Sequence, residues 1–379
     1  MSKVAIVKCQ TYEIEEVQNA IKRGIMLLGG IKSLIPEIER VLLKPNLLAS
    51  SNPDKAVTTH PVVFEGVIRL FQENGYILSY GDSPGFENPE KVAVKCGLKA
   101  VSDRYGIKFG DFTGGQTVTY EEGTITKQFE IAKAVLESEA IISLCKMKTH
   151  QLTRITGAVK NQLGCVYGLH KSSAHAKFPD AISFSKMLVD LNKLLKPKLF
   201  IMDGIVAMEG NGPRSGNPVK MDVLLFSDDP VALDSVFCRL IDLDPEYIPS
   251  IMFGEELELG KWRDHDIEIL GDKIQDLKND TFNVIRKPVI SENFGFAAYF
   301  RNIVLRKPVI DSKKCIRCGI CVDACPVEGK ALNFRYANKS QPPEYYYKKC
   351  IRCYCCQEMC PQKAIDVKTP LLGRMFLYR

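Results

Sequence analysis

The sequence predicts an α/β protein in which an open, mostly parallel sheet domain is followed by a small α+β domain. Three observations support this fold class. Short apolar runs alternate with amphipathic stretches over roughly the first 300 residues, as strands and helices do in an α/β domain. Nine of the 14 cysteines fall between residues 315 and 360. Their spacing there occurs twice, which indicates a separate small domain built on a repeat.

The elements of the sheet domain follow from their apolar periodicity. Residues 60–75 have helical spacing and end at Gly75. Asp229 and Pro230 are typical of the N-cap and first position of a helix. We expect strands at 3–9, 40–46, 76–85, 140–150, 197–204 and 221–229, helices at 13–28, 60–75 and 229–241, and a surface strand or turn at 258–272.

Polar side chains follow the apolar part of each predicted strand. In open α/β sheets, ligands bind outside the carboxyl ends of the strands. If these strands are parallel neighbours, their polar residues face one crevice. The residues are Lys44 and Asn46, Asp82 and Ser83, the segment from Lys146 to His150, Asp203, and Asp228 with Asp229.

Positive charge is concentrated where the predicted strand 140–150 ends. Lys146 and Lys148 alternate with apolar residues, so a strand places both on one face, and His150 shares their parity. Converging lysine and histidine side chains can bind a carboxylate or phosphate and supply a proton. The next stretch adds further polar groups, and a metal site from two of its histidines, His170 and His175, is an alternative. These groups are Lys160, Asn161, His170, Lys171, His175 and Lys177.

Residues 203–218 form a glycine-rich stretch that we expect to be a loop over the strand ends. Its Arg214 is available to an anion. The chain lacks the pattern G-x4-G-K-[ST], and no G-x-G-x-x-G follows the first strand. The sequence therefore carries no motif for ATP, nicotinamide or flavin.

The cysteine-rich region contains "KKCIRCGICVDACP" and "KKCIRCYCCQEMCP". Each has the spacing C-x2-C-x2-C-x3-C-P, which is typical of bacterial two-cluster ferredoxins, where the fourth cysteine ligates the other cluster. A zinc ribbon leaves the third cysteine and the proline unexplained, and disulfides do not suit a cytosolic chain. We expect two [4Fe–4S] clusters, one on Cys315, Cys318, Cys321 and Cys360, the other on Cys350, Cys353, Cys356 and Cys325, with Cys355 as an extra packing residue.

Basic residues accompany both motifs. They offset cluster charge, and they also form a candidate docking surface for an acidic electron carrier of the ferredoxin or flavodoxin type. They are Lys313, Lys314, Arg317, Lys348, Lys349 and Arg352.

Composition limits the remaining possibilities. The 379 residues suffice for two or three domains, and no apolar run reaches the length of a membrane span. The N-terminus lacks signal-peptide features, so we expect a cytoplasmic protein without a membrane partner. A net charge of +6 is mild and does not indicate a nucleic-acid surface. We expect a sheet domain at 1–290, a connector at 291–305, a ferredoxin-like domain at 306–370, and a tail at 371–379 that packs back on the body.

The chain resembles a known family. The motifs "LLKPNLL", "GDSPG", "KMKTH", "GAVKNQLG" and "SDDPVALD", followed by the twin cysteine motif, are similar to those of the domain of unknown function 362 proteins. The resemblance covers nearly the whole chain. It implies a cytoplasmic iron–sulfur protein of prokaryotes, often of anaerobes, and it identifies no substrate.

These observations predict an iron–sulfur oxidoreductase that passes single electrons to an anionic small molecule or cofactor at the strand ends. Two alternatives stay open: an electron-transfer module that docks on a partner enzyme, and a non-redox α/β enzyme with structural clusters. For the first function we expect Lys148, His150, Asp82 and Asp203 to be catalytic. We expect substrate binding by Lys44, Asn46, Ser83, Lys146, Lys160, Asn161, His170 and Arg214.

Overall fold

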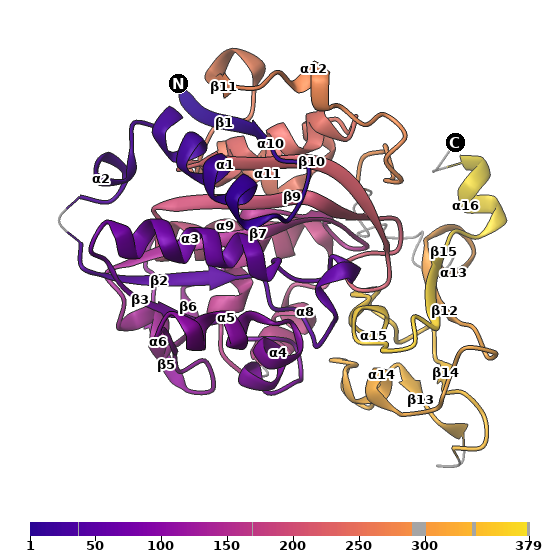
Figure 1. Ribbon diagram of the computed structural model, residues 1–379. Helices are drawn as coiled ribbons and strands as arrows, with labels where there is room; N and C mark the ends of the chain where they lie inside the picture. Colours follow the sequence, from indigo (N-terminus) through magenta and orange to yellow (C-terminus); the bar gives the residue numbers. More distant parts are fainter. Residues whose placement is uncertain (37, 169, 290–300, 336–338, 377–379) are drawn as a thin grey trace.

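A nine-stranded mixed sheet forms the centre of the molecule (Figure 1). The computed structural model describes residues 1–36, 38–168, 170–289, 301–335 and 339–376. The sheet has the order β11-β1-β10-β9-β7-β2-β3-β4, and β8 pairs with β7. Its strands are β1 (Ser2–Lys8), β2 (Arg40–Pro45), β3 (Ile77–Tyr80), β4 (Lys108–Phe109), β7 (Ala140–His150), β8 (Arg154–Thr156), β9 (Leu199–Glu209), β10 (Asn217–Ser227) and β11 (Ile267–Gly271).

Most of these strands are parallel, as predicted. β4, β3, β2, β7 and β9 form a continuous parallel block, in which Leu43 pairs with Ile142 and Lys146 with Asp203. β10 runs antiparallel to both of its neighbours, and β8 folds back on β7. The fold class predicted from the sequence is therefore confirmed as an α/β domain with a mostly parallel mixed sheet.

Helices cover both faces of the sheet. On one face, α1 and α3 pack against the apolar side of β1, β2 and β9, with α4 and α5 beside them. On the other face, α9, α10 and α11 pack against the opposite sides of β7, β9 and β10. The helices are α1 (Ile14–Leu27), α2 (Ile31–Leu34), α3 (Pro61–Glu73), α4 (Pro89–Lys95), α5 (Leu98–Arg104), α6 (Lys133–Leu136), α7 (Ala158–Asn161), α8 (His170–Lys177), α9 (Ala181–Leu195), α10 (Pro230–Leu240), α11 (Pro249–Glu256) and α12 (Ile274–Leu277).

Capping residues fix where these helices begin. The Asp229 carboxylate accepts hydrogen bonds from the backbone N–H groups of Val231 and Ala232, and Pro230 opens α10. His60 caps α3 in the same way, through Nδ1 and the N–H of Val62, ahead of Pro61. Both starts follow the general rule that a side-chain acceptor satisfies a free N–H group of the first turn.

The reversal of β10 corrects one prediction. Asp228 and Asp229 follow a strand that runs against its neighbours, so they lie at the opposite edge of the sheet from the other strand-end groups. Asp229 caps α10 there and accepts a hydrogen bond from Ser2 Oγ at 2.6 Å. Apolar periodicity carries no information on strand direction, which is why the sequence placed these residues in the crevice.

No helix or strand was predicted for residues 115–132. They form a hairpin of β5 (Gly115–Thr119) and β6 (Gln128–Ala132), outside the main sheet. Short 3-10 turns complete the sheet domain at Pro53–Lys55, Gln162–Cys165, Pro245–Tyr247 and Asp264–Asp266.

The small C-terminal domain, here called the cysteine domain (residues 301–376), has two antiparallel strand pairs, β12 with β15 and β13 with β14. Its motif repeat is also a conformational repeat: Arg317 and Arg352 have φ of 59° and 61°, and both motifs continue into a one-turn helix. The elements are α13 (Arg301–Val304), β12 (Lys307–Ile310), α14 (Ile320–Asp323), β13 (Leu332–Asn333), β14 (Glu344–Tyr345), α15 (Cys355–Glu358), β15 (Ile365–Lys368) and α16 (Leu371–Phe376).

Figure 1 shows the cysteine domain to one side of the sheet, with α15 nearest to it and α16 on the far side. α16 packs against α13 on the side of the cysteine domain away from the sheet (Figure 1), and Leu371, Leu372 and Met375 stay exposed, which differs from the predicted packing of the tail on the body. Residues 291–300 of the predicted connector, 291–305, lie outside the described residues.

Candidate functional site

The first cysteine set converges on one small cavity. Cys315, Cys318, Cys321 and Cys360 line a space of about 20 Å³ whose other walls include Ile310 and Ala364. The N–H of Ala364 donates to Cys360 Sγ at 3.3 Å. Four thiols around a mainly apolar pocket, with a backbone donor to sulfur, fit the ligand set of an iron–sulfur cluster.

The second set shows the same local arrangement. Cys325 packs with Cys350 and Ala331, and the Ala331 N–H donates to Cys325 Sγ at 3.3 Å. Cys353 and Cys356 are buried nearby, and the hydroxyl of Tyr345 lies 3.2 Å from Cys356 Sγ. Cys325 therefore meets the second motif, and Cys360 meets the first, which is the crossed arrangement expected from the spacing. These residues fit a second cluster.

An inner cavity of about 90 Å³ lies between the strand ends of the sheet domain and α15 of the cysteine domain. The sheet domain contributes residues that follow β2 and β3, together with residues of β8, α7 and α8. The cysteine domain contributes Cys355, Glu358 and Met359. Its polar lining is Asn46, Asp82, Ser83, Thr156, Lys160, Asn161, Lys171, His175 and Glu358.

A buried ion pair supports one wall. Lys44 Nζ lies 3.0 Å from Asp82 Oδ1, and the two side chains are 0% and 5% exposed. Asp82 also accepts a hydrogen bond from the Leu47 N–H at 2.6 Å. A Cβ at Gly164 would collide with the Asp82 carboxylate, so the second glycine of "GAVKNQLG" is required by a close backbone approach. Lys44 thus lies behind the cavity wall and is the ion-pair partner of Asp82.

A buried amide network supports the next wall. Lys148 donates to Asn46 Oδ1 at 2.8 Å and to the Val57 carbonyl at 2.7 Å. Asn46 donates in turn to Asn161 Oδ1 at 3.0 Å. Burial, and then the positive charge of Lys160, lower the pKa of Lys148 well below its usual value. Lys148 therefore lies behind Asn46 and holds this amide in place without lining the cavity.

Lys160 lines the cavity directly. It sits on α7, whose first N–H groups, of Ala158 and Val159, donate to the buried Asp234 carboxylate at 2.6 and 3.1 Å. A Cβ at Gly157 would collide with that carboxylate. Lys160 Nζ forms no hydrogen bond or salt bridge with another described residue. Burial lowers the pKa of Lys160, although the nearby charge of Glu358 acts to raise it.

Two further basic side chains come from α8. Lys171 donates to the carbonyls of Ser83 and Pro84, the latter at 2.9 Å, and burial lowers its pKa to about 7. The ring of His175 stacks on Phe184 with 4.3 Å between centroids. Burial lowers the pKa of His175 to about 4, so it is neutral at pH 7. Its Nδ1 has no hydrogen-bond partner among the described residues.

Glu358 connects the two domains. Its Oε1 lies 2.9 Å from Nε2 of His150, at the end of β7. Nδ1 of His150 accepts hydrogen bonds from the N–H groups of Leu152 and Thr153 at 3.1 and 3.2 Å, which leaves the ring proton on Nε2, facing Glu358. Burial acts to raise the pKa of Glu358, but His150, Lys160 and His175 lower it to about 2.

A second polar cluster is separate from the cavity. Lys146 Nζ lies 2.6 Å from Asp203 Oδ2 and 3.1 Å from the hydroxyl of Tyr12. Tyr12 donates to Asp203 Oδ1 at 3.0 Å and stacks on His60. The register shift between Lys146 and Lys148 on β7 separates the two lysines. This cluster is internally satisfied.

The family follows from comparison with known proteins. Residues 41–239 match the domain of unknown function DUF362, and residues 307–361 match a 4Fe-4S dicluster domain. The thylakoid-associated protein sll1697 of Synechocystis sp. is 35% identical over 260 residues, which cover 68% of this chain and 80% of that protein. The chain belongs to the DUF362 family. The resemblance seen in its motifs is confirmed, and this DUF362 protein carries a ferredoxin-type iron–sulfur domain.

Solved structures give weaker similarity to this DUF362 protein. The lactate racemase apoprotein from Thermoanaerobacterium thermosaccharolyticum is 11% identical, with a TM-score of 0.42, over 64% of this chain and 57% of that one. A protein from Thermotoga maritima is 12% identical, with a TM-score of 0.36, over 66% and 60%. The matched region thus spans less than two thirds of either structure.

In the residues that the structure describes, no helix has the length and apolar character required to cross a membrane.

The cavity of this DUF362 protein contains only part of the predicted site. Asn46, Asp82, Ser83, Lys160 and Asn161 line it, as expected for one shared crevice. Lys44, Lys148 and His150 lie behind its walls, and Lys146 with Asp203 form the separate cluster.

Three other expectations are corrected. His170 is exposed and packs edge-on against Tyr167, away from the cavity lining. Arg214 donates to the Met359 carbonyl at 3.0 Å, so it joins the two domains and is not directed at an anion. Arg352 is fully buried and donates to Asn302 at 2.6 Å, which removes it from the basic docking surface.

The predicted catalytic and substrate-binding residues do not include Lys171, His175 or Glu358, although Lys171 and His175 were noted as polar groups and His175 as part of an alternative metal site. Lys171 and His175 occur in a stretch with many similar polar groups. Glu358 is the middle residue between Cys356 and Cys360, and Asp323 has the same place in the first motif. Only the three-dimensional fold distinguishes the acid that reaches the cavity.

Proposed function

We propose that this protein is an iron–sulfur oxidoreductase that reduces or oxidises an anionic small molecule bound in the inner cavity. Cys315, Cys318, Cys321 and Cys360 would hold one [4Fe–4S] cluster, and Cys350, Cys353, Cys356 and Cys325 a second. When bound, such clusters supply or accept single electrons. The protein works in the cytoplasm under this proposal.

One observation carries the proposal. The inner cavity is bounded on one side by strand-end groups of the sheet domain and on the other by Cys355 and Glu358, within the second cysteine motif. A molecule in this cavity is therefore adjacent to Cys355, which lies between the ligand positions Cys353 and Cys356. A redox site needs this arrangement of substrate space next to the electron source.

The protein groups around the cavity have distinct roles in this proposal. Lys160 binds the negative charge of the substrate, and Lys44 with Asp82 keeps the wall rigid. His175 is neutral and buried, so it can donate or accept a proton at the substrate. His150 positions Glu358 at the cavity, and α15 covers the strand ends and excludes water from them.

Electrons need an entry point on the surface. Cys318 is exposed, and Lys313, Lys314, Lys348 and Lys349 are exposed beside the two motifs. We propose that an acidic carrier of the ferredoxin or flavodoxin type docks there, since complementary charge accelerates encounter.

The burial of the strand-end charges favours this function over an electron-transfer module. Lys44, Lys148 and Asp82 are buried, Lys44 against Asp82 and Lys148 against Asn46 and the Val57 carbonyl. They are therefore not available as a docking surface for a partner enzyme. The reduction potential of the clusters distinguishes the proposed function from a non-redox enzyme with structural clusters.

The test is an anaerobic reoxidation assay. The photoreduced holoprotein is mixed with small-molecule fractions of a cell extract while its visible cluster absorbance is followed. We expect one fraction to reoxidise the wild type rapidly and Lys160→Met at least about tenfold more slowly, because a charged contact is lost. Cluster content and reduction by dithionite should be equal in both proteins.

The alternatives give different results. If only protein fractions reoxidise the clusters, the protein is an electron-transfer module. If the clusters cannot be reduced at potentials that a ferredoxin or flavodoxin reaches, the clusters are structural and the proposal fails.

A further inference from the structure

We propose that the inner cavity binds one compact oxyanion or carboxylate of fewer than about six non-hydrogen atoms, held by Lys160 and the hydroxyl of Thr156. This inference rests on the proposed function and names its substrate class. It distinguishes a small substrate that receives electrons directly from an additional organic cofactor.

The charged side chains at the cavity favour an anionic ligand. Among the described residues at the cavity and its walls, Lys44, Lys148, Lys160 and Lys171 face two carboxylates, Asp82 and Glu358. Asp82 already lies against Lys44, and Glu358 against His150. The charge of Glu358 acts on Lys160, since burial lowers the pKa of His150 to about 4 and leaves its ring neutral at pH 7. Lys160 nevertheless forms no hydrogen bond or salt bridge with another described residue, in a partly desolvated space where a charge without a direct partner is costly. An anion in the cavity would provide the missing partner.

The unused hydroxyl of Thr156 also favours an anion. Thr156 pairs directly with Lys148 across β8 and β7, so both side chains are on one face of the sheet. Thr156 is 2% exposed and lines the cavity, yet its Oγ1 has no hydrogen-bond partner among the described residues. Buried polar groups are normally satisfied. The hydroxyl is therefore available to donate to an anion bound at Lys160.

The volume of the cavity favours a small ligand. An apolar cavity of about 150 Å³ in another protein holds benzene, whereas this cavity measures about 90 Å³. Sites for drug-sized ligands and cofactors span roughly 300–1,000 Å³. The cavity is partly open to solvent, so this volume limits the part of a ligand that the protein encloses, and an isoalloxazine or nicotinamide ring system would not be enclosed. Formate, acetate and small inorganic oxyanions fit it.

The surrounding amides do not compete with this site. Asn46 accepts from Lys148 and donates to Asn161, and Asn161 donates to Ser143 at 2.9 Å. These groups are satisfied within the protein, so they shape the cavity and do not select the ligand. Selection is left to Lys160, Thr156 and the neutral ring of His175.

The test measures binding and needs no turnover. The oxidised holoprotein is titrated with formate, acetate, nitrate and phosphate, and binding is followed by calorimetry and by broadening of the ligand proton lines for the two carboxylates. The carboxylates and the inorganic ions form separate arms, which identify the chemical source of the ligand. Citrate and a nucleoside diphosphate test the size limit.

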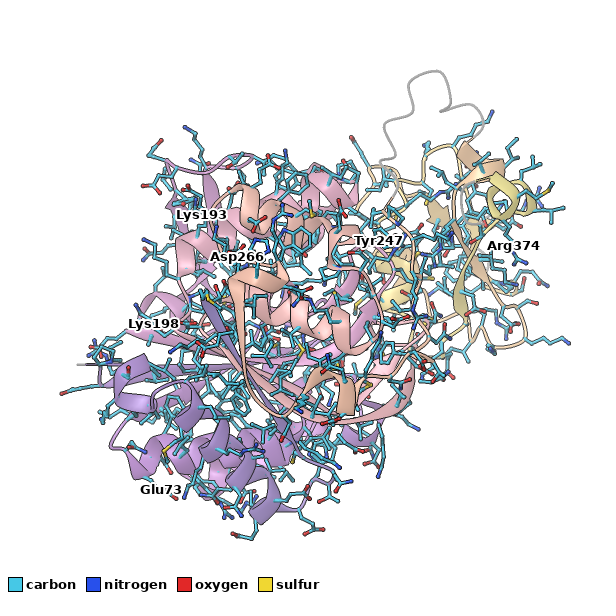
Figure 2. All side chains as sticks on the ribbon, turned by 90° about the horizontal axis from the view of Figure 1, so that it is seen from above. Glu73, Lys193, Lys198, Tyr247, Asp266 and Arg374 are labelled. Atoms are coloured by element: carbon cyan, nitrogen blue, oxygen red, sulfur yellow. The ribbon has the colours of Figure 1, made fainter. Side chains whose placement is uncertain are left out.

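Two variants and a control make the result specific. Lys160→Met should weaken binding by more than about tenfold. Thr156→Val should weaken it by about threefold to tenfold while raising Tm, because it removes a buried hydroxyl without a partner. Lys198→Met removes a charge on the side of the molecule away from the cysteine domain (Figure 2) and should leave binding unchanged.

Opposite effects of Thr156→Val on stability and on binding are the signature of a ligand-directed hydroxyl. A purely structural threonine would not give them. The inference is overturned if no small anion binds, if Lys160→Met binds as tightly as the wild type, or if citrate or the nucleotide binds more tightly than the small ions. Small-anion binding without reoxidation by any fraction would retain this site and reject the proposed redox function.

Discussion

The buried lysines of the site differ in what they contact, and this determines what their loss would cost. Lys44 lies against Asp82, Lys146 lies against Asp203, and Lys148 is held by an amide and a carbonyl. Lys160 alone among these four has no such partner within the described residues. Removing any of the first three leaves a buried acceptor behind, whereas removing Lys160 does not. We therefore expect substitution of Lys44, Lys146 or Lys148 to reduce stability, and substitution of Lys160 to reduce anion binding.

Lys44→Met tests whether a paired lysine stabilises the fold. The variant leaves the Asp82 carboxylate buried without its cation, so we expect a loss of about 3–5 kcal/mol in the free energy of unfolding. The matched control is Arg40→Met on the same strand. Arg40 pairs with Glu139 at 2.9 Å, but the two side chains are 63% and 38% exposed, so the control should cost less than about 1 kcal/mol. Equal losses in thermal or denaturant unfolding would contradict the assignment.

His60 gives a residue-scale prediction on pH. Burial lowers the pKa of His60 to about 4, below the value of about 6.5 for an unfolded chain. The unfolded state therefore takes up the proton first, and the stabilising contribution of neutral His60 is lost as the pH falls from about 6.5 to about 4. His60→Asn keeps an acceptor for the Val62 N–H. It should reduce the acid-induced loss by about 2 kcal/mol at pH 5.

The measurement for His60 is Tm at pH 7 and at pH 5. His265→Asn is the control, since the His265 side chain is 77% exposed. The prediction fails if both variants show the same difference between the two pH values as the wild type.

At the scale of elements, α15 connects the cysteine motif to the sheet domain. Gln357 donates to the carbonyl and to Oδ1 of Asn211 at 2.9 and 3.0 Å, and Glu358 reaches His150. One turn of helix thus carries a cavity wall, a docking contact and a cysteine ligand position. Its placement depends on both domains.

Gln357→Leu should loosen this docking and leave the cysteine positions intact. We expect amide hydrogen exchange at 355–360 and 210–216 to become about fivefold faster, because a hydrogen-bonded contact stabilises the closed state by about 1 kcal/mol. Cluster absorbance should be unchanged. Gln341→Leu, an exposed position in the same domain, is the control. Unchanged exchange at 210–216 would show that Gln357 does not hold the interface.

The presence of strands was easier to predict than their direction, register and contacts. The segments predicted as strands at 40–46, 76–85 and 140–150 contain β2, β3 and β7, because buried parallel strands give continuous apolar runs. The hairpin at 115–132 was missed, since its first strand is short and largely exposed. The shared crevice was predicted for Asn46, Asp82 and Lys160. The direction of β10, the register shift at Lys146 and the choice of Glu358 over Asp323 depend on tertiary pairing, which one sequence does not contain.

For the whole molecule, the two domains differ in what makes them stable. The sheet domain has two large apolar cores on either face of the sheet. The buried core of the cysteine domain consists largely of the cysteines themselves, with Leu332, Ala364 and Ile365. A core of this size needs the additional stabilisation that a metal centre provides.

Removing the clusters should therefore unfold one domain only. After anaerobic chelation with an oxidant, we expect residues 307–368 to lose protection from hydrogen exchange, while β2, β7 and β9 keep theirs. Binding of small anions should disappear with the cysteine domain, because α15 forms one wall of the cavity. The idea would be refuted if the cysteine domain stayed protected without iron.

The antiparallel strand β10 has a consequence for how the protein is assembled. Because β10 returns directly alongside β9, the chain makes a tight hairpin at 210–216, at the same edge of the sheet as the cavity. That hairpin receives the cysteine domain: Asn211 meets Gln357 and Asp366, Arg214 meets Met359, and the Gly216 carbonyl meets Lys363. A parallel strand would have required a crossover that carries the chain away from this edge. The reversal of β10 thus creates the edge hairpin on which the cysteine domain docks.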